Sequence, residues 1–239
     1  MSGPPAARHA RPEGSEEWVG PVADAGDPMP VAARDVRFEG YVWSVVSDDV
    51  EFGGVTARRD VVIHPGAVAV IALDEDDRVL LIRQYRHPVG RWLFEPPAGL
   101  LDAADEPPWR TAQRELAEES GYQAQRWDVL VDLYTSPGGM SEAIRVYLAR
   151  GLERLPDGRP HTGEAEEAHL PRAWVPLDDA RDLVLSGALG SPTAVSGILA
   201  AWTGRAANWS TLRSMDAPWP ARDRLLATDR VRLPRRNGA

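Results

Sequence analysis

Three glutamates stand close together in the segment from Arg114 to Gly121, which reads RELAEESG. On a helix, Glu115 and Glu119 are four residues apart and share one face, and Glu118 lies at the edge of that face. Carboxylate oxygens are the ligands that hard cations such as Mg²⁺ prefer, usually together with the phosphates of a substrate. The stripe therefore indicates a metal site for phosphate chemistry, although a solvated acidic face with Arg114 paired to Glu118 would use the same residues.

The composition of the chain narrows the partners that such a site could serve. The chain has 239 residues, no cysteine and a net charge of −9, from 27 Lys and Arg against 36 Asp and Glu. An acidic surface repels nucleic acid, and the lack of cysteine excludes disulfides and thiolate catalysis. We find neither a secretory signal nor a run of the roughly 18 apolar residues that a membrane span needs. We therefore expect a cytoplasmic protein that binds neither nucleic acid nor membrane.

The elements that position the glutamates follow from the hydrophobic pattern. Alternating and β-branched runs predict a strand or hairpin over 36–50, and strands over 51–62, 67–73, 78–84, 127–134 and 143–149. Helical periodicity predicts helices over about 109–120, 176–186 and 191–202. Gly121 suits the end of the first helix, and Ser191 and Pro192 suit the cap and first residue of the last one. The sum is an α+β fold with about seven strands and two or three helices.

The chain divides into four segments by composition. Residues 1–33 are rich in Pro, Ala, Gly and charge, so we expect a disordered arm. Residues 34–65 form an N-terminal strand region, and residues 66–202 form the main domain. Residues 203–239 are polar and punctuated by tryptophan, so we expect a tail that packs on the surface or on a partner chain.

From Gly99 to Tyr122 the chain resembles the signature of the Nudix hydrolases, G-x5-E-x7-R-E-U-x-E-E-x-G-U, where U is aliphatic or aromatic. Glu106 is followed by seven residues and then by Arg114, and every fixed position from Arg114 onward matches. One departure is that six residues, not five, separate Gly99 from Glu106. The resemblance implies a Nudix fold, with a mixed β-sheet between helices. It also implies hydrolysis of a nucleoside diphosphate linked to another moiety, with Mg²⁺, or Mn²⁺ in its place, as the cofactor.

The resemblance also implies roles for the residues of the signature. Glu115 and Glu119 would be the main metal ligands, and Glu118 either a further ligand or a residue that supports the ligands from behind. The backbone carbonyl of Ala98 would be an additional ligand. Arg114 would orient the glutamates through ion pairs.

The flanking segments resemble the ADP-ribose pyrophosphatase branch of this family. The resemblance lies in RQYRHPVGRWLFEPPAGLLD, in ARRDVVIHPGAVAV and in Pro137, fifteen residues past Tyr122. It implies that ADP-ribose is hydrolysed to AMP and ribose 5-phosphate. Two alternatives remain open: a Nudix hydrolase of another nucleoside diphosphate sugar or dinucleotide, and a non-catalytic Nudix domain that senses ADP-ribose.

This branch also implies substrate-binding residues. Arg86 would clamp a phosphate, which suits a bidentate guanidinium, and Glu95 would hold the loop or bind the ribose end. Arg59 would stack on the adenine, with Trp43 on the opposite side. Each has a structural alternative: Arg86 could be a surface arginine, Arg59 could pair with a nearby carboxylate, and Trp43 could pack in the core.

Two loops complete the expected site. The loop with Gly139, Met140, Ser141 and Glu142 would cover the distal ribose, whereas His64, beside Pro65, is expected to be structural. The general base of this branch is often a glutamate on a mobile loop far after the signature. The segment RPHTGEAEEAHL offers three glutamates for this role, although a solvated acidic loop would look the same. We rank Glu166 first and Glu164 second, and Glu167 is the remaining candidate.

The resemblance implies one partner besides a small nucleotide sugar, a second copy of the chain. Members of this branch commonly exchange N-terminal strands in a homodimer and build the adenine site across the interface. The strands between residues 36 and 62 would do so here. Arg59 and Trp43 would then serve the site of the partner.

Overall fold

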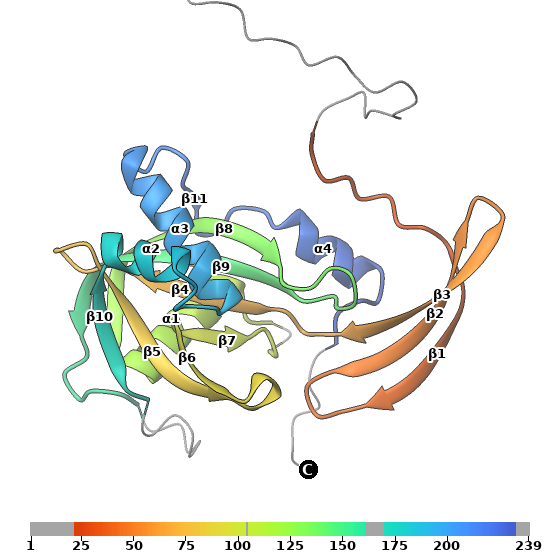
Figure 1. Ribbon diagram of the computed structural model, residues 1–239, viewed down its shortest axis with the longest axis horizontal. Helices are drawn as coiled ribbons and strands as arrows, with labels where there is room; N and C mark the ends of the chain where they lie inside the picture. Colours follow the sequence, from red (N-terminus) through yellow and green to blue (C-terminus); the bar gives the residue numbers. More distant parts are fainter. Residues whose placement is uncertain (1–21, 104, 161–169, 233–239) are drawn as a thin grey trace, which may run out of the picture.

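The computed structural model describes residues 22–103, 105–160 and 170–232 of the chain. Its strands and helices are shown in Figure 1. The strands are β1 (Val31–Glu39), β2 (Ser44–Phe52), β3 (Val55–Ile63), β4 (Ala67–Ala72), β5 (Arg78–Arg86), β6 (Arg91–Glu95), β7 (Ala98–Leu100), β8 (Tyr122–Tyr134), β9 (Ala143–Arg154), β10 (Arg172–Pro176) and β11 (Arg213–Ser214). The helices are α1 (Pro108–Ser120), α2 (Leu177–Leu185), α3 (Pro192–Ala206) and α4 (Pro220–Ala227), with a short 3₁₀ turn η1 (His87–Val89).

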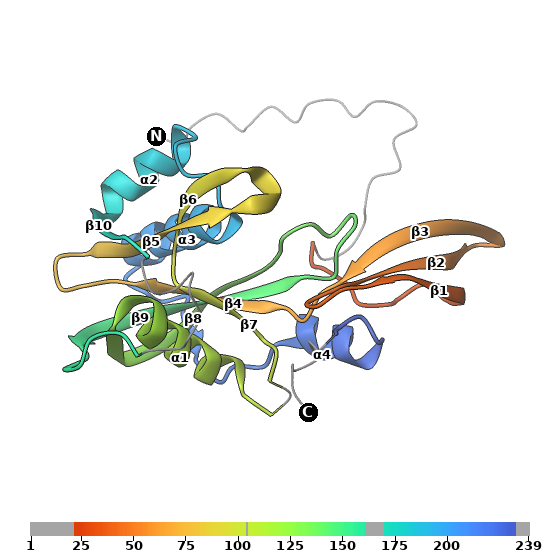
Figure 2. The same ribbon diagram turned by 90° about the horizontal axis from the view of Figure 1, so that it is seen from below.

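The strands form three sheets. The largest has the order β11-β8-β9-β4-β7 and is mixed, because β4 and β9 run parallel while its other neighbours are antiparallel. The second has the order β10-β5-β6, and the third is the antiparallel sheet β1-β2-β3. Figures 1 and 2 show this third sheet to one side of the body, beside α4. The predicted α+β class and the N-terminal antiparallel region are both present.

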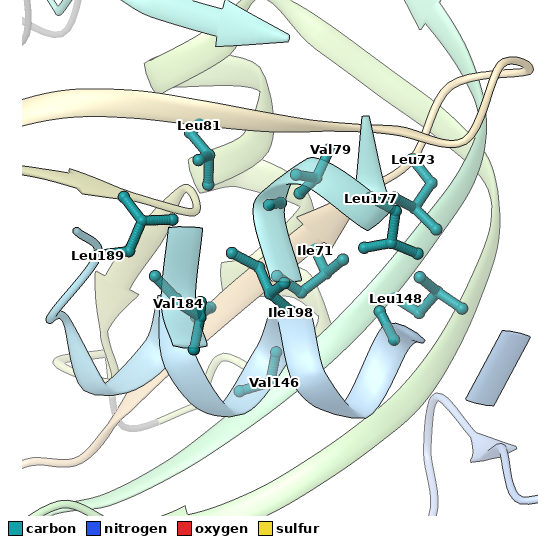
Figure 3. Close-up of a cluster of buried hydrophobic side chains, with 14 of the residues drawn as sticks. Ile71, Leu73, Val79, Leu81, Val146, Leu148, Leu177, Val184, Leu189 and Ile198 are labelled. Carbon is teal, nitrogen blue, oxygen red and sulfur yellow. The ribbon is translucent and has the colours of Figure 1, made fainter. Parts of the chain in front are cut away.

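Strand β4 is buried along its whole length, because a hydrophobic core packs against each of its two faces. Its side chains alternate between two faces, as in any strand. One face packs against α2 and α3, in the cluster drawn in Figure 3; it includes Ile71, Leu73, Val79, Leu81, Leu177, Val184 and Ile198. The other face packs against α1, through Val68, Val70, Ala112 and Leu116. Helices thus cover both faces of the mixed sheet, and α1 is held firmly against one of them.

The predicted starts of the helices agree closely with the structure, as do the ends of α1 and α2, but α3 continues to Ala206, past the predicted end at residue 202. Helix α1 begins at Pro108 and ends before Gly121, whose φ of 73° is left-handed and suits glycine. Helix α3 has Ser191 at its N-cap position and Pro192 first, as predicted. The Ser191 hydroxyl does not cap the helix, however, because it lies 3.1 Å from the hydroxyl of Thr193 and interacts with it.

Several elements differ from the expectation. The sequence analysis predicts no strand between residues 85 and 108, yet this segment contains β6 and β7, which pair with β5 and β4. Strand β1 starts at Val31, inside the segment expected to be an arm. The tail contains α4 and β11, and it reaches the core: Trp219 is 5% exposed and belongs to the cluster around α1.

The C-terminal segment ties the N-terminal sheet to the body. Arg34 donates to the carbonyl of Asp229 (3.1 Å), and Arg232 donates to the carbonyl of Trp43 (3.0 Å). Arg222 donates to the carbonyl of Pro65 at 2.7 Å, where the sheet meets β4. Across the three described ranges, no helix is both long enough and apolar enough to span a membrane.

A substitution in α3 tests the packing of the core between β4 and the helices α2 and α3. Alanine in place of a helical glycine normally stabilises by about 1 kcal/mol, but a Cβ on Gly197 would lie 2.8 Å from Cδ1 of Ile71. Overpacking of this kind costs about 1–3 kcal/mol, so we expect Gly197→Ala to lower the free energy of unfolding by about 1 kcal/mol. Urea denaturation measures this, with Gly190→Ala as the control because its Cβ would meet nothing within 4 Å. Equal stability of the two variants would refute the tight contact.

Candidate active site

Helix α1 buries two of its glutamates. Glu115 is 7% exposed and Glu119 is 5% exposed, on a helix whose Ala112 and Leu116 are fully buried in the core. Burying carboxylates is costly unless they have charged or hydrogen-bonding partners. These two therefore do not lie on a solvated acidic face, which was the alternative interpretation of the stripe.

Arg114 lies at the centre of an ion-pair network on α1. It donates to Glu115 at 2.7 Å, to Glu118 at 3.0 Å and to Glu106 at 3.2 Å. The hydroxyl of Thr111 donates to the same Glu106 oxygen at 2.9 Å. Burial opposes ionisation of Glu106, but the bonds from Arg114 and Thr111 outweigh it and lower the pKa of this carboxyl. The network has the contacts through which Arg114 was expected to orient the glutamates.

Glu106 reaches this network even though one extra residue precedes it. The loop between β7 and α1 contains the additional residue, and Glu106 still contacts both Thr111 and Arg114. The departure from the signature therefore does not displace its first glutamate from the helix.

Strand β7 brings backbone atoms against the glutamates. Glu119 accepts a hydrogen bond from the backbone N–H of Ala98 at 2.8 Å. A Cβ on Gly99 would lie 2.1 Å from Oε1 of Glu115, so only glycine permits this approach. Glu115, Glu119 and the backbone of Ala98 are thus brought together, as the predicted metal site requires.

The donor set fits a divalent cation. Its atoms are hard carboxylate oxygens, two of them on buried side chains, beside a strand backbone that has no side chain at Gly99. Within the described parts of the chain, no three acidic, histidine or cysteine side chains come together as a group that could hold a metal ion by themselves. An open set agrees with the preference of Mg²⁺ for one or two carboxylates plus substrate phosphates and water.

Arg86 and Glu95, both predicted to bind substrate, form a pair. The Nε of Arg86 donates to Glu95 at 2.7 Å, and the Glu95 side chain is 8% exposed against 43% for Arg86. The buried carboxylate therefore holds the partly exposed guanidinium in one orientation. The sequence did not reveal this pairing, because it depends on how β5 folds back onto β6.

A cavity of about 490 Å³ lies between the N-terminal sheet, the loop from β8 to β9, and the C-terminal segment. Three predicted substrate-binding residues line it: Arg59, Gly139 and Met140. The guanidinium of Arg59 lies 5.7 Å from the ring centre of Phe52, which also lines the cavity. Arg59 donates to the carbonyl of Arg58 at 2.9 Å.

Trp43 does not lie opposite Arg59 in this chain. It precedes β2, is 42% exposed, and its ring centre lies 6.3 Å from that of His64 in an edge-on contact. Arg59 lies on β3, opposite Asp48 in the register of β2 against β3. Phe52 is the aromatic neighbour that sequence reasoning missed. Its place beside the glycine turn at residues 53–54, in an alternating strand, is the signal that could have indicated it.

Glu142 belongs to a partly buried network and does not line the cavity. The hydroxyl of Thr135 donates to it at 2.5 Å, and Nε2 of His64 lies 3.5 Å from its other oxygen. The Nδ1 of His64 accepts the N–H of Gly66 at 3.1 Å, which agrees with the structural role expected of this histidine. The remaining predicted residues, Glu164, Glu166 and Glu167, lie outside the described residues.

Stability is expected to depend on the protonation of His64. Burial lowers the pKa of this imidazole, and the nearby Glu142 only partly opposes the effect. The unfolded chain therefore binds a proton at His64 more readily than the folded chain does. The stability that neutral His64 contributes is fully present above its unfolded pKa of about 6.5, and it is lost as the pH falls through its lower pKa in the folded chain. We expect the urea concentration at the unfolding midpoint to decrease when the pH is lowered from 7.5 to 5.5. A His64→Gln variant should show a weaker fall, and an equal fall would contradict the assignment.

The matched family defines the class of protein. Residues 63–193 match the model of the NUDIX domain family, which covers more than half of the chain. The chain therefore belongs to the NUDIX family, as the signature and the mixed sheet between helices predicted.

Particular relatives agree with this membership. The chain is 43% identical over 193 residues to an ADP-ribose pyrophosphatase of Mycobacterium tuberculosis, over 80% of this chain and 91% of the relative. It is 38% identical over 156 residues to an ADP-ribose pyrophosphatase of Bacillus subtilis, over 64% of this chain and 82% of the relative. A solved structure described as an ADP compounds hydrolase has the same fold, with a TM-score of 0.66 at 23% identity, over 78% of this chain and 98% of that one.

Proposed function

We propose that this protein is a metal-dependent ADP-ribose pyrophosphatase, which hydrolyses the diphosphate bond of ADP-ribose to AMP and ribose 5-phosphate. The observation that carries the proposal is the burial of Glu115 and Glu119 against the backbone of β7, together with the hydrogen bond that Arg114 donates to Glu115. The activity named for the relatives of M. tuberculosis and B. subtilis supports the choice of substrate.

The side chains of α1 would hold the metal. Glu115, Glu118, Glu119 and the carbonyl of Ala98 are the proposed ligands, and we propose Mg²⁺, with Mn²⁺ as the alternative. When bound, such ions neutralise the diphosphate and polarise the attacking water. Arg114 keeps Glu115 and Glu118 oriented, because it is bonded to both.

Other residues of the chain would orient the substrate and accept the proton. Arg86, held by Glu95, presents its guanidinium to a phosphate, for which a planar fork is well suited. Glu166, with Glu164 as the second choice, is proposed to take the proton of the attacking water. In the cavity, Arg59 and Phe52 would offer a cationic and an aromatic surface to the adenine, and Gly139 and Met140 also line it.

We also propose that the protein is a cytoplasmic homodimer joined through the N-terminal sheet. This sheet exposes large apolar side chains on strands that project from the body: Val36 is 59% exposed, Phe38 61% and Val55 67%. Apolar side chains grouped in this way favour burial against another surface. Light scattering during gel filtration tests the assembly, and a monomeric mass at micromolar concentration would contradict it.

The activity is tested by incubating the purified chain with ADP-ribose and separating the products. We expect AMP and ribose 5-phosphate in equal amounts with Mg²⁺, none after chelation by EDTA, and recovery when Mg²⁺ is added in excess. Persistent activity in EDTA would contradict the metal site. Tight binding of ADP-ribose without turnover would identify a sensor instead of an enzyme.

A further inference from the structure

The cavity beside the N-terminal sheet has more cationic than anionic groups available to a ligand. Of its carboxylates, Asp48 is held by Arg34 through two bonds of 2.7 and 2.8 Å, which lower the pKa of Asp48 although burial opposes this. Asp60 accepts a 2.5 Å bond from the hydroxyl of Ser47. Asp27, which is exposed, is the remaining carboxylate among the described lining residues.

Two of the cations come from the C-terminal segment, which no part of the signature covers. Arg224 on α4 and Arg230 just after it line the cavity together with Arg59. Among the described residues, no carboxylate forms an ion pair with Arg224 or Arg230, and the 2.9 Å bond of Arg59 goes to a backbone carbonyl. Three guanidinium groups from two distant parts of the chain therefore line one cavity, and none of them forms an ion pair with a described carboxylate. Arg230 is close enough to Asp48 to contribute to the lowered pKa of that carboxyl, whose oxygens are already bonded to Arg34.

The backbone holds both C-terminal arginines in place. Helix α4 ends at Ala227, and the chain turns at Asp229, whose φ of 53° is left-handed. The N–H of Arg230 donates to the carbonyl of Leu225 at 2.9 Å. Arg34 donates to the carbonyl of Asp229, which fixes this turn against the sheet. A built turn of this kind presents Arg230 to the cavity at a defined position.

Gly26 makes room for the other arginine. A Cβ built on Gly26 would overlap the guanidinium of Arg224, so the arginine lies directly against the backbone of this residue. Alanine at this position would move the end of a flexible side chain without straining the backbone, because Gly26 does not have a positive φ. The two termini of the described chain thus position Arg224 jointly.

We propose that the C-terminal segment supplies a phosphate-binding element to this cavity, in which Arg224 and Arg230 contact the phosphate of the AMP half of the substrate. The proposal rests on the proposed function, since it names residues that bind that substrate. Guanidinium groups bind phosphate through paired, charge-assisted hydrogen bonds. The AMP half fits better than the ribose 5-phosphate half, because Arg59 and Phe52 offer stacking surfaces for a base in the same cavity.

The test is calorimetric titration of AMP and of ribose 5-phosphate into the full chain without metal. We expect Arg224→Gln and Arg230→Gln each to weaken AMP binding about tenfold, with ribose 5-phosphate unaffected. Gly26→Ala should weaken AMP binding about threefold, because it displaces Arg224 without removing its charge. Arg126→Gln is the matched control, since Arg126 is an exposed arginine on β8 that does not line the cavity.

The outcomes separate the proposed role of the two arginines from the proposed enzyme activity. AMP affinity that is unchanged in Arg224→Gln and Arg230→Gln, or a wild-type chain that does not bind AMP, would overturn the role of these arginines. A loss confined to ribose 5-phosphate would overturn the assignment to the AMP half. Turnover of ADP-ribose is measured separately, so arginine-dependent AMP binding without turnover would reject the proposed enzyme and leave this site standing.

Discussion

Glu119→Gln is expected to lower kcat for ADP-ribose hydrolysis by about a thousandfold at saturating Mg²⁺, which corresponds to about 4 kcal/mol of transition-state stabilisation. The substitution removes the negative charge that a divalent ion requires. It keeps an oxygen that can accept the N–H of Ala98, now at 2.8 Å from the carboxylate, so the helix and β7 should stay together. Steady-state rates over a range of Mg²⁺ concentrations measure the effect.

The matched control is Glu153→Gln. Glu153 is also a hydrogen-bonded glutamate, with Gln123 at 2.9 Å and Gln125 at 2.5 Å as partners, but it lies exposed on β9. Its replacement should leave kcat unchanged, and both variants should unfold at the temperature of the wild type within a few degrees. A Glu119→Gln variant with the turnover rate of the wild type would refute the assignment of the metal site.

Gly99→Ala is expected to lower kcat about a hundredfold without removing any functional group. A Cβ at this position would lie 2.1 Å from Oε1 and 2.2 Å from Cδ of Glu115, so the carboxylate must move away from β7. The crowding should also lower the free energy of unfolding by about 1–3 kcal/mol. Activity assays and urea denaturation on the same preparation separate the two effects.

Gly190→Ala serves as the control for this substitution. A Cβ on Gly190 would meet nothing within 4 Å, its φ is not positive, and it does not line the cavity. We expect wild-type stability and a rate within about twofold of the wild type. If Gly99→Ala were as active as Gly190→Ala, the close approach of β7 to Glu115 would have no bearing on the reaction.

The sequence was most informative where spacing along one element decides the geometry. The positions of Glu115 and Glu119 on one face, the end of α1 before Gly121 and the buried strand β4 all depend on residues within a few turns of one another. Helix periodicity and a glycine cap express such local rules directly. The family followed from the same short stretch.

The parts that the sequence did not indicate depend on contacts between distant segments. The pairing of Arg86 with Glu95 requires the β5–β6 hairpin, and the contact of Arg59 with Phe52 requires the register of β2 against β3. Trp219 lies far along a polar tail, yet it packs in the core around α1, with the guanidinium carbon of Arg145 4.7 Å from the centre of its ring. Local composition does not indicate which residues pack against distant parts of the chain. In its sequence, a short polar segment around a buried tryptophan therefore looks like a tail on the surface.

The measurement that tests the proposed function most directly is a comparison of kcat/KM for ADP-ribose, ADP-glucose, GDP-mannose, NADH and a diadenosine polyphosphate with Mg²⁺. We predict that ADP-ribose is preferred by at least about tenfold, as the proposed function requires. The cavity accounts for the preference over GDP-mannose, because the adenine proposed to bind there is present in every substrate of the panel except GDP-mannose. A higher kcat/KM for any of the other four would contradict the proposed substrate while leaving the metal-binding helix in place. No turnover of any of the five would contradict the proposed enzyme itself.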